Sequence, residues 1–234
     1  MREAVIVSYA RTGMAKANRG SLNNTHGITM AGTAIKGALD RAGIEAGLVE
    51  DVFLGCAQPE GATGHNVARN AALWAGCPST TSGATINRFC SSGLQAIANA
   101  AHTVINEGAP VAIGGGVESM SRVPMGASGG AWSSDPQVAL KTYFAPQGIG
   151  ADTIATKWGF SRDDVDAYAV ESQKRAAKAW EEGRFKNSIV PVKDQMGAII
   201  LDHDEHMRPD ASMQSLASLN PSFVMPGEMG GFDA

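Results

Sequence analysis

The sequence predicts an α/β protein built on a parallel sheet, and three observations support this fold class. Short apolar runs rich in β-branched residues alternate with segments in which apolar residues recur at helical spacing. Glycines stand at several of the boundaries between these segments. Hydrophobic residues make up 44% of the 234 residues and charged residues 18%, a composition that supports a substantial core. We therefore expect right-handed crossover connections and a layered α/β sandwich.

The first half of the chain supplies the alternating elements. Residues 3–10, "EAVIVSYA", are predicted to form a strand buried on both faces, because the run is apolar and β-branched. Apolar residues at helical spacing predict a helix over 28–43, which Gly43 ends. The same alternation continues along the chain. Strands are predicted at 49–57, 84–89 and 109–119, and helices at 66–76 and 91–107.

The composition changes near residue 120. Residues 125–137 are rich in Gly and Ser and are predicted to form a loop. A long helix is predicted over 161–183, because Ser161 is a favourable N-cap and Asp164 completes a pattern close to a capping box. A short strand at 188–193 and an irregular tail over 202–234 are expected to follow. Within that tail, "DHDEH" (202–206) is interpreted as a solvated turn rather than a metal site.

Charge and cysteine content exclude several classes of function. The formal net charge is −4 with no block of basic residues, so neither nucleic acid nor an anionic membrane is expected as a partner. Three cysteines provide no disulfide framework and no paired zinc-binding spacing, which favours a reducing compartment. No apolar stretch approaches the ~18 residues of a membrane span. We therefore expect a soluble cytoplasmic protein.

Cys90 is the first candidate for chemistry. It stands where an extended run stops and an alanine-rich helix begins, in "NRFCSSGLQA". The positive end of a helix dipole and the unpaired N–H groups there favour a thiolate, and the small residues after Cys90 leave room for an acyl group. The alternative is a buried structural cysteine. Cys56 and Cys77 are predicted to be packing residues.

Several segments occur together in the order found in the thiolase family. The nucleophile segment and glycine-rich strand end of thiolases resemble "NRFCSSGLQAI" (87–97) and "GGGVESMS" (114–121). Further thiolase segments resemble 10–22, 64–73 and 161–192, with Gly13 where a proline is usual. The resemblance covers essentially the whole chain, and its motifs are linked and in order.

The resemblance implies a fold and a division into domains. The N-terminal half would be a thiolase-like layered α/β sandwich with an inserted α+β loop domain. Residues 1–121 would form the N-terminal domain, which carries the nucleophile. Residues 122–234 would form the coenzyme A-binding loop domain, incomplete at its C-terminal end. The C-terminal half of the family's fold would be absent from this chain.

The resemblance also implies an activity, namely acyl transfer between 3-ketoacyl-CoA and coenzyme A through a thioester on Cys90. A thiolate attacking a thioester carbonyl, with backbone N–H groups near the oxyanion, is consistent with the position of Cys90. Arg208 and Ser215 fall where the family contacts the nucleotide end of coenzyme A. The family needs no cofactor and no metal, because coenzyme A is a substrate. A homodimer or homotetramer in fatty-acid metabolism, including β-oxidation, is expected.

Two family motifs do not occur in these 234 residues. Thiolases use an activating histidine in a "GHP"-type motif and a second cysteine in a "CxGG"-type motif, and both are missing. This chain alone is therefore expected to be inactive. It is interpreted as a piece of a longer thiolase, as half of an enzyme completed by a separate polypeptide, or as a non-catalytic coenzyme A- or lipid-binding subunit. A ketoacyl synthase of the same fold is the other alternative.

One departure bears on the substrate. Acetoacetyl-type thiolases carry a histidine-methionine-glycine motif facing the substrate where this sequence has Pro146, Gln147 and Gly148. The sequence therefore favours a 3-ketoacyl-CoA thiolase of broader or longer-chain range over a short-chain biosynthetic enzyme.

Overall fold

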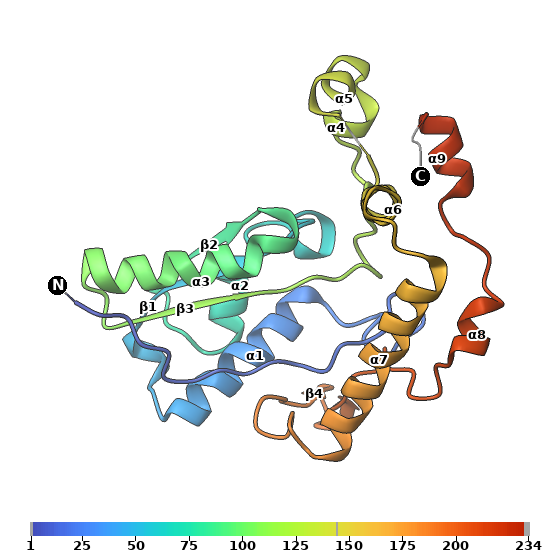
Figure 1. Ribbon diagram of the computed structural model, residues 1–234. Coiled ribbons are helices and arrows are strands. Elements are labelled where there is room, and N and C mark those ends of the chain that lie inside the picture. The colour runs from blue at the N-terminus through green and yellow to red at the C-terminus, as the bar shows by residue number, and fades with distance from the viewer. Residues whose placement is uncertain (1, 144, 232–234) are drawn as a thin grey trace. The chain divides into compact units, whose positions relative to one another are not determined.

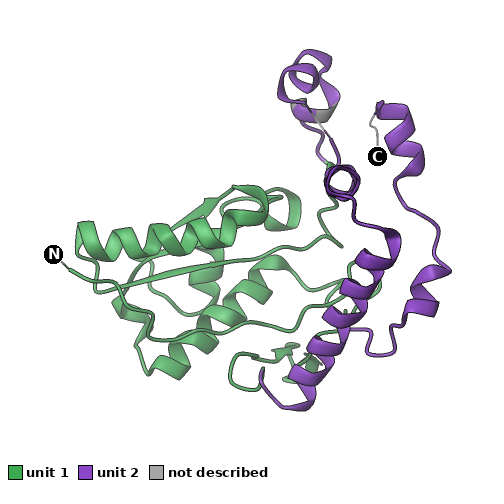
Figure 2. Ribbon diagram, viewed as in Figure 1, with its two compact units in different colours: residues 1–127, 185–206 green, residues 128–184, 207–234 purple. Residues whose placement is uncertain are grey.

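The computed structural model describes residues 2–143 and 145–231. The chain divides into two compact units, each made from two stretches of sequence, as Figure 2 shows. Unit 1 consists of residues 1–127 and 185–206, and unit 2 of residues 128–184 and 207–234. The boundary expected from the family resemblance, between residues 121 and 122, lies near the end of the first stretch of unit 1.

Unit 1 is built on a three-stranded parallel sheet. Its strands are β1 (Val49–Gly55), β2 (Ser82–Ile86) and β3 (Val111–Gly116), in the spatial order β2-β1-β3. The chain crosses over β1 on its way from β2 to β3. Because both strand pairs are parallel, the carboxyl ends of all three strands lie at one edge of the sheet. The predicted α/β class with parallel pairing is confirmed.

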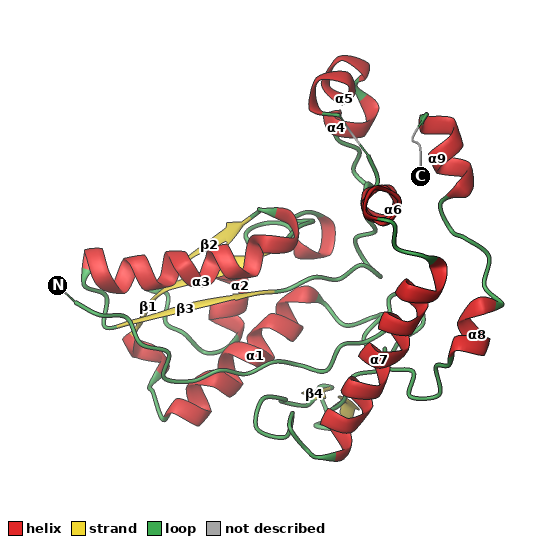
Figure 3. Cartoon of the chain, in the orientation of Figure 1, coloured by secondary structure: helices red, strands yellow, loops and turns green. Residues whose placement is uncertain are grey.

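Helices cover both faces of this sheet (Figures 1 and 3). The helices α1 (Gly27–Ala42) and α2 (Val67–Trp74) pack against each other and share a core with Val52 and Leu54 of β1. The opposite face is covered by α3 (Ser92–His102), which continues as a π-helical turn, Thr103–Glu107. Short 3₁₀ turns lie at Ala46–Leu48, Gly61–Thr63 and Phe89–Ser91. All three predicted helices of this half are therefore present.

The predicted strand at 3–10 is wrong. Residues 3–10 make no strand ladder with any described part of the chain, and Val5 and Ile6 are 73% and 80% exposed. Their side chains border an apolar groove of about 590 Å³ whose other walls include Ile97 and Ile113. A β-branched run favours extended backbone, but a strand ladder also needs a partner from elsewhere in the chain, which the local pattern does not specify.

The second stretch of unit 1 packs beside the segment before α1. The antiparallel strands β4 (Val192–Lys193) and β5 (Ile199–Leu201) form a small core with Leu22 and Met30. The strand predicted at 188–193 is therefore shorter than expected, although Ile189 makes an isolated parallel bridge with Arg11.

The turn at 202–206 is solvated only in part: Asp202, His203 and His206 are exposed, but Asp204 and Glu205 bind distant residues. Asp204 forms a two-pronged ion pair with Arg11, with N–O distances of 2.7 and 3.0 Å. Glu205 accepts hydrogen bonds from the Ser21 hydroxyl and from the backbone N–H groups of Lys16 and Ser21. These contacts span more than 180 residues of sequence, so a local pattern could not reveal them. The carboxylates hold the two stretches of unit 1 together.

Unit 2 is helical in its described residues. Its helices are α4 (Ala131–Ser134), α5 (Pro136–Thr142), α6 (Gln147–Trp158), α7 (Arg162–Glu181), α8 (Met213–Ala217) and α9 (Val224–Gly230). The capping box predicted for α7 is confirmed, because the Ser161 and Asp164 side chains each bond to the other residue's backbone N–H. The loop predicted at 125–137 and the irregular tail contain the short helices α4, α5, α8 and α9. No described helix is both long and apolar enough to cross a membrane.

Candidate functional site

Cys90 lies in the turn between β2 and α3. The turn Phe89–Ser91 follows the end of β2 and leads directly into α3. The Cys90 side chain is exposed, whereas Cys56 and Cys77 are buried. The structure therefore excludes the alternative that Cys90 is a buried packing cysteine. It places the thiol at the N-terminal end of an eleven-residue helix, where the helix dipole and unpaired N–H groups favour negative charge.

The residue before Cys90 adopts an unusual backbone conformation. Phe89 has a φ angle of 46°, in the left-handed region that bulky side chains rarely occupy. Such a conformation costs on the order of 1–3 kcal/mol and persists only where the surrounding structure holds it. The strain lies directly beside the exposed thiol.

Two side chains hold the strained residue from both ends of its backbone. The Phe89 N–H donates to the Asn87 Oδ1 at 2.9 Å. The Ser92 hydroxyl donates to the Phe89 carbonyl at 2.6 Å and accepts from the Arg88 N–H at 2.8 Å. Ser92 is itself buried and is the first residue of α3. The turn around Cys90 is therefore fixed by residues on both sides of the cysteine.

A second set of bonds joins this turn to the ends of the neighbouring strands. The Asn87 amide donates from Nδ2 to the carbonyl of Ala57 at 3.2 Å. The Glu118 carboxylate accepts from the N–H groups of Ala57 and Gln58 at 2.8 and 3.2 Å. Asn87 follows β2, Ala57 follows β1 and Glu118 follows β3. The carboxyl ends of all three strands are thus linked beside Cys90.

Burial disfavours the thiolate form of the two other cysteines. Burial, together with the negative charge of Glu118, raises the pKa of Cys56 to about 11, although a hydrogen bond with Thr63 acts in the opposite direction. Burial also raises the pKa of Cys77, which the charge of Arg69 partly offsets. Both residues belong to the buried core, as predicted from the sequence.

The two residues predicted to contact coenzyme A lie in unit 2. The Arg208 backbone N–H donates to the Gln173 side chain of α7 at 2.7 Å. Its exposed guanidinium makes no hydrogen bond or ion pair with the described part of the chain. Ser215 forms a capping box with Ser212 at the start of α8, and its hydroxyl donates to the Ser212 carbonyl at 2.9 Å.

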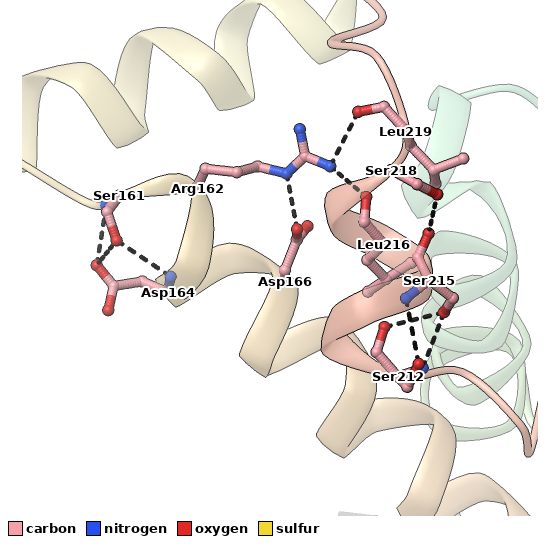
Figure 4. A network of polar contacts seen from close by, with 9 residues as sticks. All are labelled: Ser161, Arg162, Asp164, Asp166, Ser212, Ser215, Leu216, Ser218 and Leu219. Atoms are coloured by element: carbon pink, nitrogen blue, oxygen red, sulfur yellow. Dashed lines mark hydrogen bonds and ion pairs between the residues drawn. The ribbon is translucent and has the colours of Figure 1, made fainter.

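Arg162 connects the helix that holds Ser215 to α7 (Figure 4). Its Nε donates to Asp166 at 2.8 Å, and its Nη2 donates to the carbonyls of Leu216 and Leu219 at 2.6 and 3.2 Å. These bonds place a cation at the C-terminal end of α8, on the Leu216 carbonyl within the helix and on the Leu219 carbonyl just after it, where the helix dipole favours positive charge. Arg162 therefore fixes the segment that carries Ser215.

Sequence reasoning missed three residues of the site around Cys90, namely Asn87, Ser92 and Glu118. Asn87 lies in the motif around Cys90 without a predicted role, and Ser92 is predicted there only as one of the small residues that leave room for an acyl group. Glu118 stands in "GGGVESMS", where its acidic side chain directly after a glycine-rich strand end was the available signal. In the sequence, 61 residues separate Ala57 from Glu118, so only the order of the strands reveals the contact.

The whole chain is similar to a family of known proteins. Residues 4–233 match the family described as "Thiolase, N-terminal domain". A 3-ketoacyl-CoA thiolase of Bacillus subtilis (strain 168) is 42% identical over 242 aligned residues, which cover 97% of this chain and 61% of that protein. An acetyl-CoA acetyltransferase of Shinella zoogloeoides is 37% identical, covering 96% and 60%. A beta-ketoadipyl-CoA thiolase of Pseudomonas aeruginosa (strain PAO1) is 36% identical, covering 94% and 59%.

The chain thus spans about three fifths of the length of these relatives. Their names favour a thiolase over a ketoacyl synthase of the same fold. The match extends over both compact units, and the parallel sheet with helices on both faces is consistent with it. This chain belongs to the thiolase family, within the region of the family's N-terminal domain.

Proposed function

We propose that this chain is the nucleophile-bearing part of a thiolase, an acyl-CoA C-acyltransferase. The reaction transfers an acyl group between 3-ketoacyl-CoA and coenzyme A through a thioester on Cys90. The observation that carries the proposal is the exposed Cys90 thiol at the start of α3, in a chain whose relatives are named as thiolases. Cys56 and Cys77 are buried, and burial raises the pKa of both thiols, so neither suits this role.

The chemistry begins with attack of the Cys90 thiolate on the 3-keto carbonyl of the substrate. The C2–C3 bond then breaks, the acyl group stays on Cys90 as a thioester, and acetyl-CoA leaves after protonation of its carbanion. The thiol of free coenzyme A next attacks the thioester, and the Cys90 thiol is restored. Unpaired N–H groups at the start of α3 suit the stabilisation of the oxyanion.

The proton transfers need groups that this chain does not supply in the family's positions. The histidine that activates the nucleophile belongs to the "GHP" motif, and the second cysteine, which acts as acid or base on the carbanion and on coenzyme A, belongs to the "CxGG" motif. Neither motif occurs in these 234 residues. Since the chain spans about three fifths of its relatives, we assign these steps to the remaining part of a complete thiolase.

Coenzyme A would be bound by unit 2. The Arg208 guanidinium is exposed and matches a phosphate in charge and geometry. The Ser215 hydroxyl already donates within its capping box, so it would act toward the ligand as an acceptor. No cofactor and no metal is required, because the nucleophile is a side chain and coenzyme A is a substrate.

For the substrate range we propose 3-ketoacyl-CoA of medium or longer chain. Pro146 is the N-cap of α6, and Gly148 packs against the ring of Phe223. This segment thus has neither the imidazole nor the methionine found in acetoacetyl-type thiolases. Turnover should be compared across a series of 3-ketoacyl-CoA chain lengths with a complete enzyme. A marked preference for acetoacetyl-CoA would contradict this part of the proposal.

We further propose that the protein works in the cytoplasm as a homodimer or homotetramer in fatty-acid degradation. The oligomer is supported by α3, which exposes Leu94 and Ile97 with 72% and 43% of their surface accessible in the described chain. Apolar side chains this exposed beside a candidate nucleophile are suited to burial by another part of the assembly.

The test is capture of the acyl-enzyme. A complete enzyme that contains this chain is incubated with acetyl-CoA or 3-ketoacyl-CoA, quenched in acid and mapped by peptide mass spectrometry. We expect one acyl group on Cys90, none on Cys56, and none in a Cys90→Ala variant. Protection of Cys90 from iodoacetamide by acyl-CoA without any acyl adduct would instead indicate a non-catalytic binding subunit.

A further inference from the structure

We propose that Asn87 and Glu118 are positioning residues for Cys90, acting through the Ala57 peptide, and this rests on the function proposed for Cys90. The Glu118 carboxylate orients the peptide groups after β1. The Ala57 carbonyl orients the Asn87 amide, and that amide holds the left-handed Phe89 in place. Neither residue would touch the reacting atoms.

The first step is the need for a clamp at Phe89. A non-glycine residue at a φ of 46° returns to a more favourable conformation unless it is held. The Asn87 Oδ1 holds the Phe89 N–H, and the Ser92 hydroxyl holds its carbonyl. Because Phe89 and Cys90 share a peptide bond, rotation at Phe89 would move the thiol away from the start of α3.

The second step is that the Asn87 side chain uses both ends of its amide. Oδ1 accepts from Phe89 and Nδ2 donates to Ala57, so the side chain must be an acceptor on one side and a donor on the other. A carboxylate offers only acceptors, and an aliphatic side chain offers neither. The arrangement is therefore specific for an amide side chain at this position.

The third step extends the support to β3. Both Glu118 oxygens are used, one by the Ala57 N–H and the other by the Gln58 N–H and the Cys56 thiol. Fixing the N–H groups of 57 and 58 fixes the peptide planes on either side of the Ala57 Cα, and the second of these planes contains the Ala57 carbonyl. The carbonyl that orients Asn87 is thus held from a strand that is not adjacent to β2 in the sheet.

Asn66 provides a matched control on the other side of β2. Its Oδ1 accepts from the Arg69 N–H and the Thr85 hydroxyl, and its Nδ2 donates to the Gly83 carbonyl at 2.8 Å. Like Asn87, Asn66 is exposed and bridges two backbone segments beside β2 through its side-chain amide. Asn66 itself adopts a left-handed conformation. It has no hydrogen bond to the Cys90 turn.

The experiment measures the rate of alkylation of Cys90 by iodoacetamide as a function of pH, read from the Cys90 peptide. Wild type, Asn87→Ala, Glu118→Gln and Asn66→Ala are compared, and urea unfolding is recorded for each. We expect Asn87→Ala and Glu118→Gln to slow alkylation near neutral pH by about five- to tenfold. Asn66→Ala should lose comparable stability but keep the wild-type profile.

The Glu118→Gln variant separates positioning from simple electrostatics. Removing a negative charge would by itself favour nearby thiolates, so a purely electrostatic role predicts faster alkylation of Cys90 in Glu118→Gln. Positioning predicts slower alkylation. If Glu118→Gln does not fold, Asn87→Ala alone decides the outcome. Wild-type alkylation kinetics in Asn87→Ala, or the same slowing in Asn66→Ala, would overturn the proposal.

Failure of the function proposed for Cys90 gives a different result. In that case the complete wild-type enzyme forms no acyl adduct on Cys90, whatever the alkylation profiles of the variants. In a complete enzyme, the positioning role predicts a lower kcat in Asn87→Ala with the KM for acyl-CoA unchanged, because Asn87 does not touch the substrate. A raised KM with unchanged kcat would assign Asn87 to substrate binding and overturn the positioning role.

Discussion

Replacing Gly55 by alanine tests how closely α3 must approach the sheet. A Cβ atom at Gly55 would lie 2.5 Å from the Ser92 carbonyl oxygen, and closer than 3.0 Å to the Gly93 nitrogen. Ordinary contact begins near 3.4 Å, so the start of α3 would have to move by roughly 1 Å. The obstacle is backbone and cannot rotate away. Overpacking of this kind typically costs about 1–3 kcal/mol.

The displacement would act directly on the Cys90 turn, because Ser92 and Gly93 begin α3. We therefore expect Gly55→Ala to lower the free energy of unfolding, measured by urea denaturation, by about 1–3 kcal/mol. We also expect slower alkylation of Cys90 in the fraction that remains folded. Gly47→Ala is the matched control. Among residues 2–143 and 145–231, no atom beyond its chain neighbours lies within 4 Å of its added Cβ, and its φ angle is not positive, so it should be neutral or slightly stabilising.

Equal stability of Gly55→Ala and wild type would refute this reasoning. It would mean that α3 can shift on the sheet without loss of packing. A loss of stability with unchanged Cys90 kinetics would show that the turn is held independently of the contact between α3 and β1. A loss of stability in Gly47→Ala as large as in Gly55→Ala would show that the cost reflects glycine replacement in general.

Three further predictions concern the contacts described above. Hydrogen bonds from Ser21 and from backbone N–H groups lower the pKa of Glu205, so its contribution to stability is present above the unfolded-state value near 4.5 and is lost as pH falls through the lower folded-state pKa. Glu205→Gln should therefore reduce stability at pH 7 by about 1 kcal/mol or less, and the difference from wild type should shrink in acid, as followed by urea titrations. Arg208→Ala should raise the KM for acyl-CoA with kcat little changed in a complete enzyme, and an unchanged KM would reject the phosphate contact. Arg162→Ala should release α8 from α7, which faster hydrogen exchange at the backbone N–H of Leu216 would reveal.

The helices and parallel strands of unit 1 were predictable because their signals are local. Gly43 does end α1 in a left-handed conformation, with a φ of 64°. The capping box at Ser161 fixes where α7 begins. Such signals depend on a few neighbouring residues and on water, so they survive without knowledge of the rest of the fold.

The predictions that were wrong failed because the structure of those segments depends on distant parts of the chain. Residues 3–10 carry a strand pattern but find no ladder partner in the described chain. Glu205 and Asp204 look like solvated acids in the sequence, yet their partners lie near residues 11–21. In each case the outcome depends on which distant segment occupies the adjoining space, and hydrophobic periodicity contains no information on that.

The candidate site depends on local and non-local signals together, which explains why Cys90 was predicted but the residues that hold its turn were not. The place of Cys90 follows from the local change between strand and helix. Its support depends on the strand order β2-β1-β3, since only a central β1 brings residue 57 within reach of both Asn87 and Glu118. With β1 at an edge of the sheet, the same sequence motifs would leave the Cys90 turn attached to one neighbour instead of two. The strained Phe89 is therefore maintained by the topology of the sheet, and the motif around Cys90 is insufficient without it.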